Sequence, residues 1–172
     1  MTQIHPFSPL TIAPDFGTIL FTPCPGTQIA DLPTSLQQLA NAGACAIVTL
    51  MPAAEMQRNQ VTAMPDHCAQ LGLQWFHLPI EDDNVPTSEF ANAWQACHEQ
   101  LHALLKSGKH LAIHCKGGTG RTGLVAAKLL LEMGIGLDEV ISMVRSVRPK
   151  ALQIPAQLQY IQHQAGLLAA GN

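Results

Sequence analysis

The sequence predicts an α/β domain in which a central, mostly parallel sheet of about four to five strands is covered by helices on both faces. Two observations support this fold class. Short apolar runs alternate along the chain with segments in which apolar residues recur at helical spacing. One run, residues 44–50 (ACAIVTL), is apolar almost throughout, which is typical of a strand that helices cover on both sides.

Capping and turn residues set the limits of the individual elements. Asp31 is placed to cap a helix that Gly43 ends. Thr87 or Ser88 begins a long helix with one apolar stripe, and prolines keep the N-terminal segment extended. In chain order we expect strands at 17–22, 44–50, 73–79 and 111–113, and helices at 31–42, within 53–71, at 87–107, 121–133 and 138–147, and up to about residue 168.

Length and composition predict one domain spanning residues 1–172, because this length suffices for one sizeable core. The net charge of −3 provides no basic field that would favour binding to nucleic acid or to an anionic membrane. We also expect the protein to be a monomer. The longest strongly apolar run, 124–131, falls far short of the ~20 residues of a membrane span. Five cysteines without paired spacing suit the reducing cytoplasm.

The segment 114–122 (HCKGGTGRT) joins a predicted strand to an apolar helix, and its residues indicate an anion-binding loop. Gly117, Gly118 and Gly120 let the backbone curl so that its N–H groups point inward. The helix that begins near Arg121 adds unpaired amides and the positive end of its dipole. Such a loop binds phosphate and similar anions.

The same loop contains groups for nucleophilic chemistry. A thiol at a helix N-terminus beside a guanidinium ionises more readily than a free thiol, so Cys115 is the expected nucleophile. Arg121 lies at the rim of the loop, where its planar fork can hold two phosphate oxygens in a way that lysine cannot. Thr122 follows directly and is placed to donate a hydrogen bond to the sulfur.

HCKGGTGRT resembles the H-C-x(2)-G-x(2)-R-[ST] signature of the Cys-dependent tyrosine and dual-specificity phosphatases, and the chain is most similar to their kinase-associated (cyclin-dependent kinase inhibitor 3-like) branch. The resemblance implies a single-domain phosphatase fold and hydrolysis of phosphate monoesters through a phosphocysteine intermediate, without a metal or other cofactor. The phosphate-binding residues that it implies are Lys116, Gly117, Gly118, Thr119, Gly120 and Arg121.

The family carries a general acid on a loop upstream of the cysteine. Here the polar segment 79–86 (PIEDDNVP) holds Asp82 and Asp83, and some family members have P-[IF]-x-D at this place, which matches Asp82. Such an acid supplies the proton for the departing oxygen. We therefore favour Asp82 and keep Asp83 as the alternative; without the resemblance, the segment would be a solvated acidic turn.

Further residues are expected to support the reaction. His114 is expected to hold the loop from behind through hydrogen bonds. The resemblance places Gln157 where several members orient the hydrolytic water, with Gln153 as the other candidate and ordinary polar surface as the alternative. Arg145, Arg148 and Lys150 form a small basic cluster, which is expected on a solvated face, with a face toward a phosphoprotein as the alternative.

The segment 98–102 (HEQLH) is a competing motif, because H-E-x-x-H on a helix is a known zinc arrangement with Glu99 as base. No third ligand follows at the metzincin spacing, and the next acidic residue, Glu132, lies beyond a separate strand and loop. We therefore expect two histidines on the flank of a packing helix, and no metal.

The expected substrate is a phosphoprotein carrying phosphotyrosine, phosphoserine or phosphothreonine. A phosphoinositide or another small phosphate ester is the alternative: Lys116 matches the first lysine of the phosphoinositide phosphatase loop, but Thr119 stands where those enzymes carry a second. More remote alternatives are a non-catalytic phosphate-binding module, a sulfurtransferase and an H-E-x-x-H zinc hydrolase.

Overall fold

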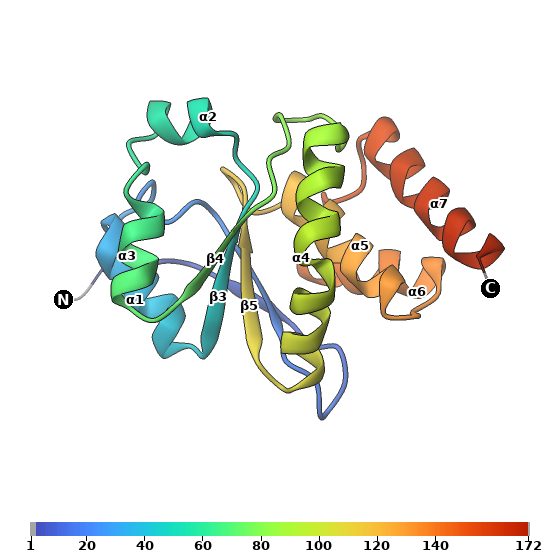
Figure 1. Ribbon diagram of the computed structural model, residues 1–172, viewed down its shortest axis with the longest axis horizontal. Helices are drawn as coiled ribbons and strands as arrows, with labels where there is room; N and C mark the ends of the chain where they lie inside the picture. Colours follow the sequence, from blue (N-terminus) through green and yellow to red (C-terminus); the bar gives the residue numbers. More distant parts are fainter. Residues whose placement is uncertain (1–2, 172) are drawn as a thin grey trace.

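The computed structural model describes residues 3–171, which form five strands and seven helices (Figure 1). The strands are β1 (Ser8–Leu10), β2 (Ile19–Thr22), β3 (Ala44–Thr49), β4 (Gln74–His77) and β5 (His110–His114). The helices are α1 (Leu32–Asn41), α2 (Ala53–Arg58), α3 (Met64–Gln70), α4 (Ser88–Lys106), α5 (Gly120–Glu132), α6 (Leu137–Val147) and α7 (Pro155–Ala170). Every predicted element is present, and β1 is an addition within the segment predicted only as extended.

The strands form one sheet in the order β1-β2-β5-β3-β4. β1 runs antiparallel to β2 and all other neighbours pair in parallel, so the prediction of a mostly parallel sheet is confirmed. His114, the last residue of β5, pairs in register with Thr22 on one side and Thr49 on the other. Three strands thus end together at one edge of the sheet, which is where α/β proteins place their ligands.

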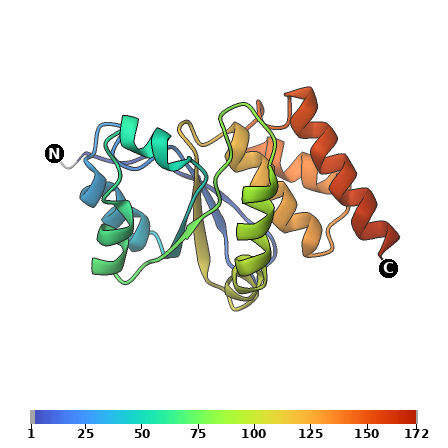
Figure 2. The same cartoon turned by 45° about the horizontal axis from the view of Figure 1, so that its top comes forward.

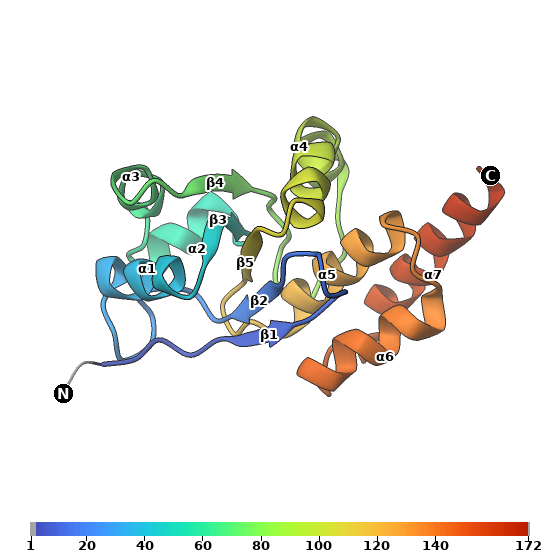
Figure 3. The ribbon, with the colours of Figure 1, turned by 90° about the horizontal axis from the view of Figure 1, so that it is seen from below.

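Side chains that alternate along the strands divide the core into two layers. In β3, Ala46 and Val48 belong to the layer formed with α4, α5, α6 and α7, whereas Ile47 belongs to the layer formed with α1 and α3. Figures 2 and 3 show these two groups of helices on opposite sides of the sheet. Both faces of the sheet are buried, which explains the continuous apolar character of β3.

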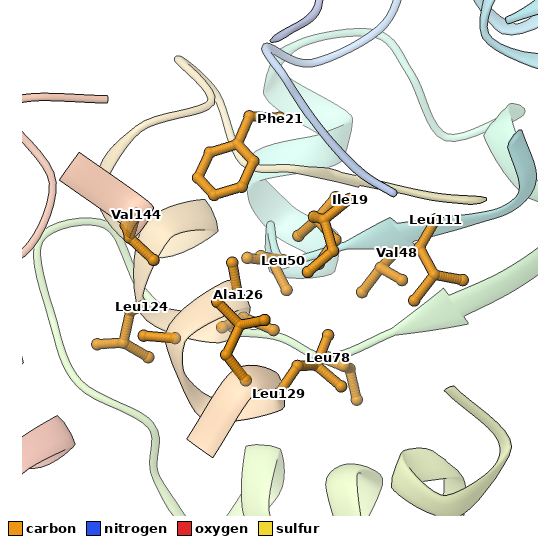
Figure 4. Packing of buried hydrophobic residues seen from close by; sticks show 14 of the residues in the cluster. Ile19, Phe21, Val48, Leu50, Leu78, Leu111, Leu124, Ala126, Leu129 and Val144 are labelled. Atoms are coloured by element: carbon orange, nitrogen blue, oxygen red, sulfur yellow. The ribbon is translucent and has the colours of Figure 1, made fainter. Parts of the chain in front are cut away.

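α5 lies at the centre of the larger layer. Its residues 121–131 are all buried, as expected for a helix that is apolar all round. Leu124 and Leu129 of this helix lie in one cluster with Phe21 of β2 and Val144 of α6 (Figure 4). Because this packing fixes the axis of α5, it also fixes the position of the helix start, where the predicted anion-binding loop ends.

Local signals act as expected at several helix ends. Oδ1 of Asp31 accepts a hydrogen bond of 2.8 Å from the Thr34 amide and caps α1. Gly43 follows this helix with a φ of 102°, a conformation that favours glycine. Pro65 lies in the first turn of α3. Within residues 3–171, no helix combines the length and the hydropathy that crossing a membrane requires.

Candidate active site

Residues 115–121, which we call the cysteine loop, connect β5 to the first turn of α5 and surround the sulfur of Cys115. Cys115 is buried, with 4% of its surface exposed. Its Sγ accepts one hydrogen bond from the Gly118 amide at 3.3 Å and another from the Thr122 hydroxyl at 3.2 Å. Both donors would stabilise negative charge on the sulfur.

Gly118 allows the cysteine loop to approach the end of β2. Its φ is 77°, and a Cβ at this position would lie only 2.5 Å from the carbonyl carbon of Thr22. The Cys24 amide donates to the Lys116 carbonyl at 3.0 Å, and Nε of Arg148 donates to the Gly118 carbonyl at 3.1 Å. The loop backbone is therefore held from two sides of the molecule.

The prediction of a solvated basic face is wrong for Arg145 and Arg148. The Arg148 guanidinium also donates to Ser8 Oγ at 2.8 Å and to the Phe21 carbonyl at 3.3 Å. Arg145 Nη2 donates to the Leu152 carbonyl at 2.7 Å. Both side chains are half-buried and donate hydrogen bonds to backbone carbonyls.

Arg121 is almost fully buried, and a carboxylate that the sequence analysis missed holds it. Its Nη1 and Nη2 atoms donate hydrogen bonds of 2.9 Å to the two carboxylate oxygens of Glu55, in α2. Nη1 also donates to the Ile80 carbonyl at 3.0 Å. Burial alone lowers the pKa of Arg121, but the Glu55 hydrogen bonds and the nearby Cys115 and Asp82 raise this pKa above its ordinary value.

Glu55 occupies one edge of the Arg121 guanidinium and leaves the other edge, formed by Nε and Nη2, for a different acceptor. Nε is buried and has no hydrogen-bond partner within residues 3–171. Nη2 lies 3.3 Å from Oδ1 of Asp82. A buried donor without a partner costs about 1–3 kcal/mol, so a bidentate anion such as phosphate would be stabilised on this edge.

His114 supports the cysteine loop from behind, as the sequence predicts. Its Nδ1 lies 3.0 Å from the Cys115 carbonyl, which can only accept, so Nδ1 carries the proton. Nε2 then accepts from the Thr49 hydroxyl at 2.7 Å, and Nε1 of Trp75 donates to the same hydroxyl oxygen at 2.8 Å. Burial lowers the pKa of His114 to about 4, so the ring is neutral at physiological pH.

The acid loop, residues 79–86 between β4 and α4, brings only one of its two candidate carboxylates into contact with Arg121. The Asp82 side chain is 70% exposed and its Oδ1 lies 3.3 Å from Arg121 Nη2. The Asp83 amide donates to that oxygen at 3.0 Å. Asp83 itself has a φ of 60° and forms no ion pair with the side chains of residues 3–171. Of the two candidate carboxylates, Asp82 is therefore the one that lies close to Arg121 of the cysteine loop.

Gln157 and Gln153 are separated by the structure. Gln157 is 1% exposed, and its Nε2 donates to the carbonyl of Asn84 in the acid loop at 3.1 Å. Its Oε1 is buried, has no partner within residues 3–171, and would lie 3.9 Å from a Cβ at Gly120. Gln153 is exposed and donates to the Pro149 carbonyl at 3.2 Å. Of the two, only Gln157 contacts the acid loop and lies beside the cysteine loop.

The remaining predicted binding residues form the outer part of the cysteine loop. Lys116 and Gly117 are exposed, and Thr119 and Gly120 are half-buried. Of the two basic residues of the loop, Lys116 is therefore exposed to solvent, whereas Arg121 is buried.

The two histidines of the HEQLH segment share a contact with a third residue, Glu132. Oε1 of Glu132 lies 3.3 Å from Nδ1 of His98 and 3.1 Å from Nε2 of His102. In the sequence, a strand and a loop separate Glu132 from the motif, so Glu132 was not expected to join the two histidines. Folding nevertheless brings the end of α5 against α4 and unites these three side chains.

Comparisons with known proteins agree with this geometry. A family model described as "Polymorphic toxin system, DSP-PTPase phosphatase" matches residues 25–135. Cyclin-dependent kinase inhibitor 3 of Rattus norvegicus is 31% identical over 153 residues, covering 85% of this chain and 71% of that protein. The tyrosine-protein phosphatase CDC14 of Saccharomyces cerevisiae is 32% identical over 99 residues, covering 57% of this chain and 17% of that protein.

Solved structures extend the likeness to the whole chain. Kinase associated phosphatase, with its catalytic cysteine replaced by serine, is similar with a TM-score of 0.84 at 25% identity, covering 99% of both chains. The matched family region begins before α1 and contains both the acid loop and the cysteine loop. The chain therefore belongs to the Cys-dependent tyrosine and dual-specificity phosphatases, enzymes that hydrolyse phosphate monoesters through a phosphocysteine intermediate.

Proposed function

We propose that Cys115, Arg121 and Asp82 are the catalytic residues and that the substrate is a phosphorylated protein. In the first step, the Cys115 thiolate attacks phosphorus in line, the bond from phosphorus to the leaving oxygen breaks, and Asp82 donates a proton to that oxygen. In the second step, water attacks the phosphocysteine, Asp82 takes a proton from the water, and the thiolate departs. Phosphate and the free enzyme result.

The second edge of the Arg121 guanidinium, formed by Nε and Nη2, is the observation that carries this proposal. Its Nε is buried without a partner within residues 3–171, at the end of the loop that surrounds the Cys115 sulfur. Two parallel N–H groups on this edge match two equatorial oxygens of a phosphoryl group. As charge on these oxygens changes during transfer, donors that are already oriented stabilise the transition state without reorganisation.

We assign Gln157 a positioning role in the second step. Its side chain joins the acid loop, through Asn84, to the region beside Gly120, and its Oε1 has no hydrogen-bond partner among residues 3–171. We propose that this oxygen accepts a hydrogen bond from the hydrolytic water. Gln153, which is exposed and bonded to Pro149, has no part in this proposal.

The names of the relatives support a protein substrate. The yeast relative is a tyrosine-protein phosphatase, and the rat relative is named as an inhibitor of a cyclin-dependent kinase. A phosphoinositide is the second candidate, because a relative from Arabidopsis thaliana is named as both a phosphatidylinositol 3,4,5-trisphosphate 3-phosphatase and a protein-tyrosine-phosphatase. The exposed ammonium of Lys116 suits either kind of anionic substrate.

A reducing compartment such as the cytoplasm fits the proposed chemistry. A thiolate nucleophile has to remain reduced in order to attack phosphorus. All five cysteines are free, and burial raises the pKa of Cys24 and Cys68 to about 12, which keeps both in the unreactive thiol form.

Hydrolysis of p-nitrophenyl phosphate tests the catalytic assignment. We expect Cys115→Ser to abolish turnover, and Cys97→Ser, a matched change at a half-buried cysteine of α4, to retain it. Turnover that persists in Cys115→Ser would contradict the proposal. The same variant can retain substrates, so its binding to phosphopeptides and to phosphoinositide vesicles distinguishes the two candidate substrate classes.

A further inference from the structure

We propose that His98, His102 and Glu132 form a zinc site on the flank of the molecule. His98 and His102 lie one turn apart on α4, and Glu132 is the last residue of α5. Figures 1 and 3 show these two helices side by side. The site lies at the opposite end of α5 from the cysteine loop, about 18 Å away along the helix axis. None of its residues takes part in the proposed phosphatase chemistry.

The three candidate ligand atoms are already near the spacing that zinc requires. Oε1 of Glu132 lies 3.3 Å from Nδ1 of His98 and 3.1 Å from Nε2 of His102, and all three atoms lie within 4.8 Å of one another. Tetrahedral zinc with bonds of about 2.0–2.1 Å holds its ligand atoms about 3.3–3.4 Å apart. Two separations therefore match, and the third, between the two imidazole nitrogens, is no more than 4.8 Å.

Neighbouring side chains orient the proposed ligands. Nε1 of Trp94 donates to Oε2 of Glu132 at 2.8 Å, which leaves Oε1 directed at the two histidines. The Trp94 ring also stacks on His98, with 6.2 Å between ring centroids. Metal sites depend on such outer contacts, because they fix ligands in one orientation before the metal binds.

Space and ligand chemistry favour zinc. A hollow of about 500 Å³ lies in front of these groups and gives room for a water as fourth ligand. Two imidazoles and one carboxylate are a common zinc set, whereas magnesium and calcium prefer oxygen ligands alone.

The surrounding charges set the expected affinity. The Lys128 ammonium lies 3.5 Å from Oε2 of Glu132 and opposes a dication, and Lys106 lines the same hollow. The carboxylate of Glu99, which also lines the hollow, partly offsets these charges. We therefore expect binding in the micromolar range, and not the much tighter binding of a zinc finger.

Bound zinc would tie together the two helices that follow the active-site loops. α4 begins directly after the acid loop, and α5 begins within the cysteine loop. A ligand that binds only the folded chain stabilises it in proportion to its concentration and affinity. Zinc would thus raise the melting temperature through a contact far from the proposed catalytic residues.

Equilibrium dialysis with zinc, followed by metal analysis, tests the site. The Cys115→Ser protein is used throughout, because an accessible cysteine thiolate can itself coordinate zinc. We expect about one zinc per chain in this background. Adding His102→Gln should weaken binding at least about 10-fold, whereas adding His163→Gln, at an exposed histidine of α7, should not change it.

Circular dichroism and melting curves complete the test. Far-ultraviolet spectra establish that each variant is folded, and His98→Asn replaces His102→Gln if the latter does not fold. Zinc should raise the melting temperature of the Cys115→Ser protein and of its His163→Gln derivative only. Absence of stoichiometric zinc, or zinc binding that survives the loss of either His98 or His102, would overturn the proposal.

Discussion

The cysteine loop and the acid loop meet at the same edge of the sheet, yet they are held in opposite ways. Cys115 and Arg121 are 4% and 2% exposed, whereas the Asp82 side chain is 70% exposed. Contacts from the segment that follows β2, from α2 and from Arg148 at the C-cap of α6 fix the cysteine loop. Donors that stabilise charge on a phosphoryl group have to be held rigidly. A carboxyl group that protonates leaving groups of different shapes has only to come within hydrogen-bond distance of the leaving oxygen.

Arg121→Lys is expected to have the largest effect, because it changes a buried residue of the rigidly held cysteine loop. Lysine keeps the charge but loses both the bidentate contact with Glu55 and the free Nε edge. We expect kcat/KM for p-nitrophenyl phosphate to fall ~10³-fold. Steady-state kinetics measures the loss, and Arg58→Lys, at an exposed arginine of α2, is the matched control. Near-normal activity in Arg121→Lys would mean that charge alone suffices.

The rigid side should also be sensitive to acid. Burial lowers the pKa of His114 to about 4 in the folded protein, against about 6.5 in an unfolded chain. Between these pH values the unfolded chain binds more protons than the folded chain. The contribution of His114 to the free energy of unfolding is therefore fully present above pH ~6.5, and about 3 kcal/mol of it is lost as the pH drops to ~4. His5, whose pKa burial also lowers, adds to this trend.

Urea unfolding at a series of pH values measures this dependence. His114→Asn should lower stability near neutral pH and flatten its decline in acid, whereas His163→Gln should leave the decline unchanged. An equally steep decline in His114→Asn would assign the acid sensitivity to other groups.

Asp82→Asn tests the exposed side of the comparison. Loss of the proton donor should lower kcat/KM for an alkyl phosphate ~10²-fold, because a poor leaving group depends on protonation. Asp83→Asn, which removes the neighbouring carboxylate, is the control and should have little effect. If Asp83→Asn is the more damaging change, the acid loop rearranges on binding and the assignment of the two residues has to be exchanged.

Gln157→Leu should have the smallest effect, because Gln157 touches both loops without contacting the sulfur. Losing one hydrogen bond to the hydrolytic water should slow the second step about 10-fold. Rapid-mixing kinetics would then show a larger burst of p-nitrophenol and more accumulated phosphocysteine. Gln153→Leu should leave the burst unchanged, and a Gln157→Leu enzyme that forms phosphocysteine slowly would place the residue in the first step instead.

Local patterns in the sequence were sufficient for the elements and for the centre of the site. Strand–loop–helix spacing and three glycines predicted the cysteine loop, because its shape depends mainly on its own residues. The pair Asp82 and Asp83 was ambiguous in sequence, since adjacent residues differ only in backbone direction. The φ of 60° at Asp83 and the contact of Asp82 with Arg121 distinguish them in the structure.

The missed residues make contacts that local patterns do not encode. Glu55 and Arg121 are 66 positions apart, and Glu55 lies in a short helix whose sequence is unremarkable. The available signal was its place just beyond β3, at the sheet edge where β5 also ends. Arg148 was predicted to be surface charge because its partner Ser8 is 140 positions away, and no local pattern links the two residues. Glu132 was not expected to join His98 and His102 because it is also far from them in the sequence, although it lies beside them in the fold.

The attachment of the cysteine loop to segments that precede and follow it in the sequence has a consequence for biosynthesis. Thr22 is made before the loop, and Arg148 is made after it. A nascent polypeptide that already contains Cys115 therefore lacks the late support until α6 has left the ribosome. The cysteine loop would be held from both sides only once residue 148 has emerged, so a nascent chain that stops short of that residue would be a poor enzyme.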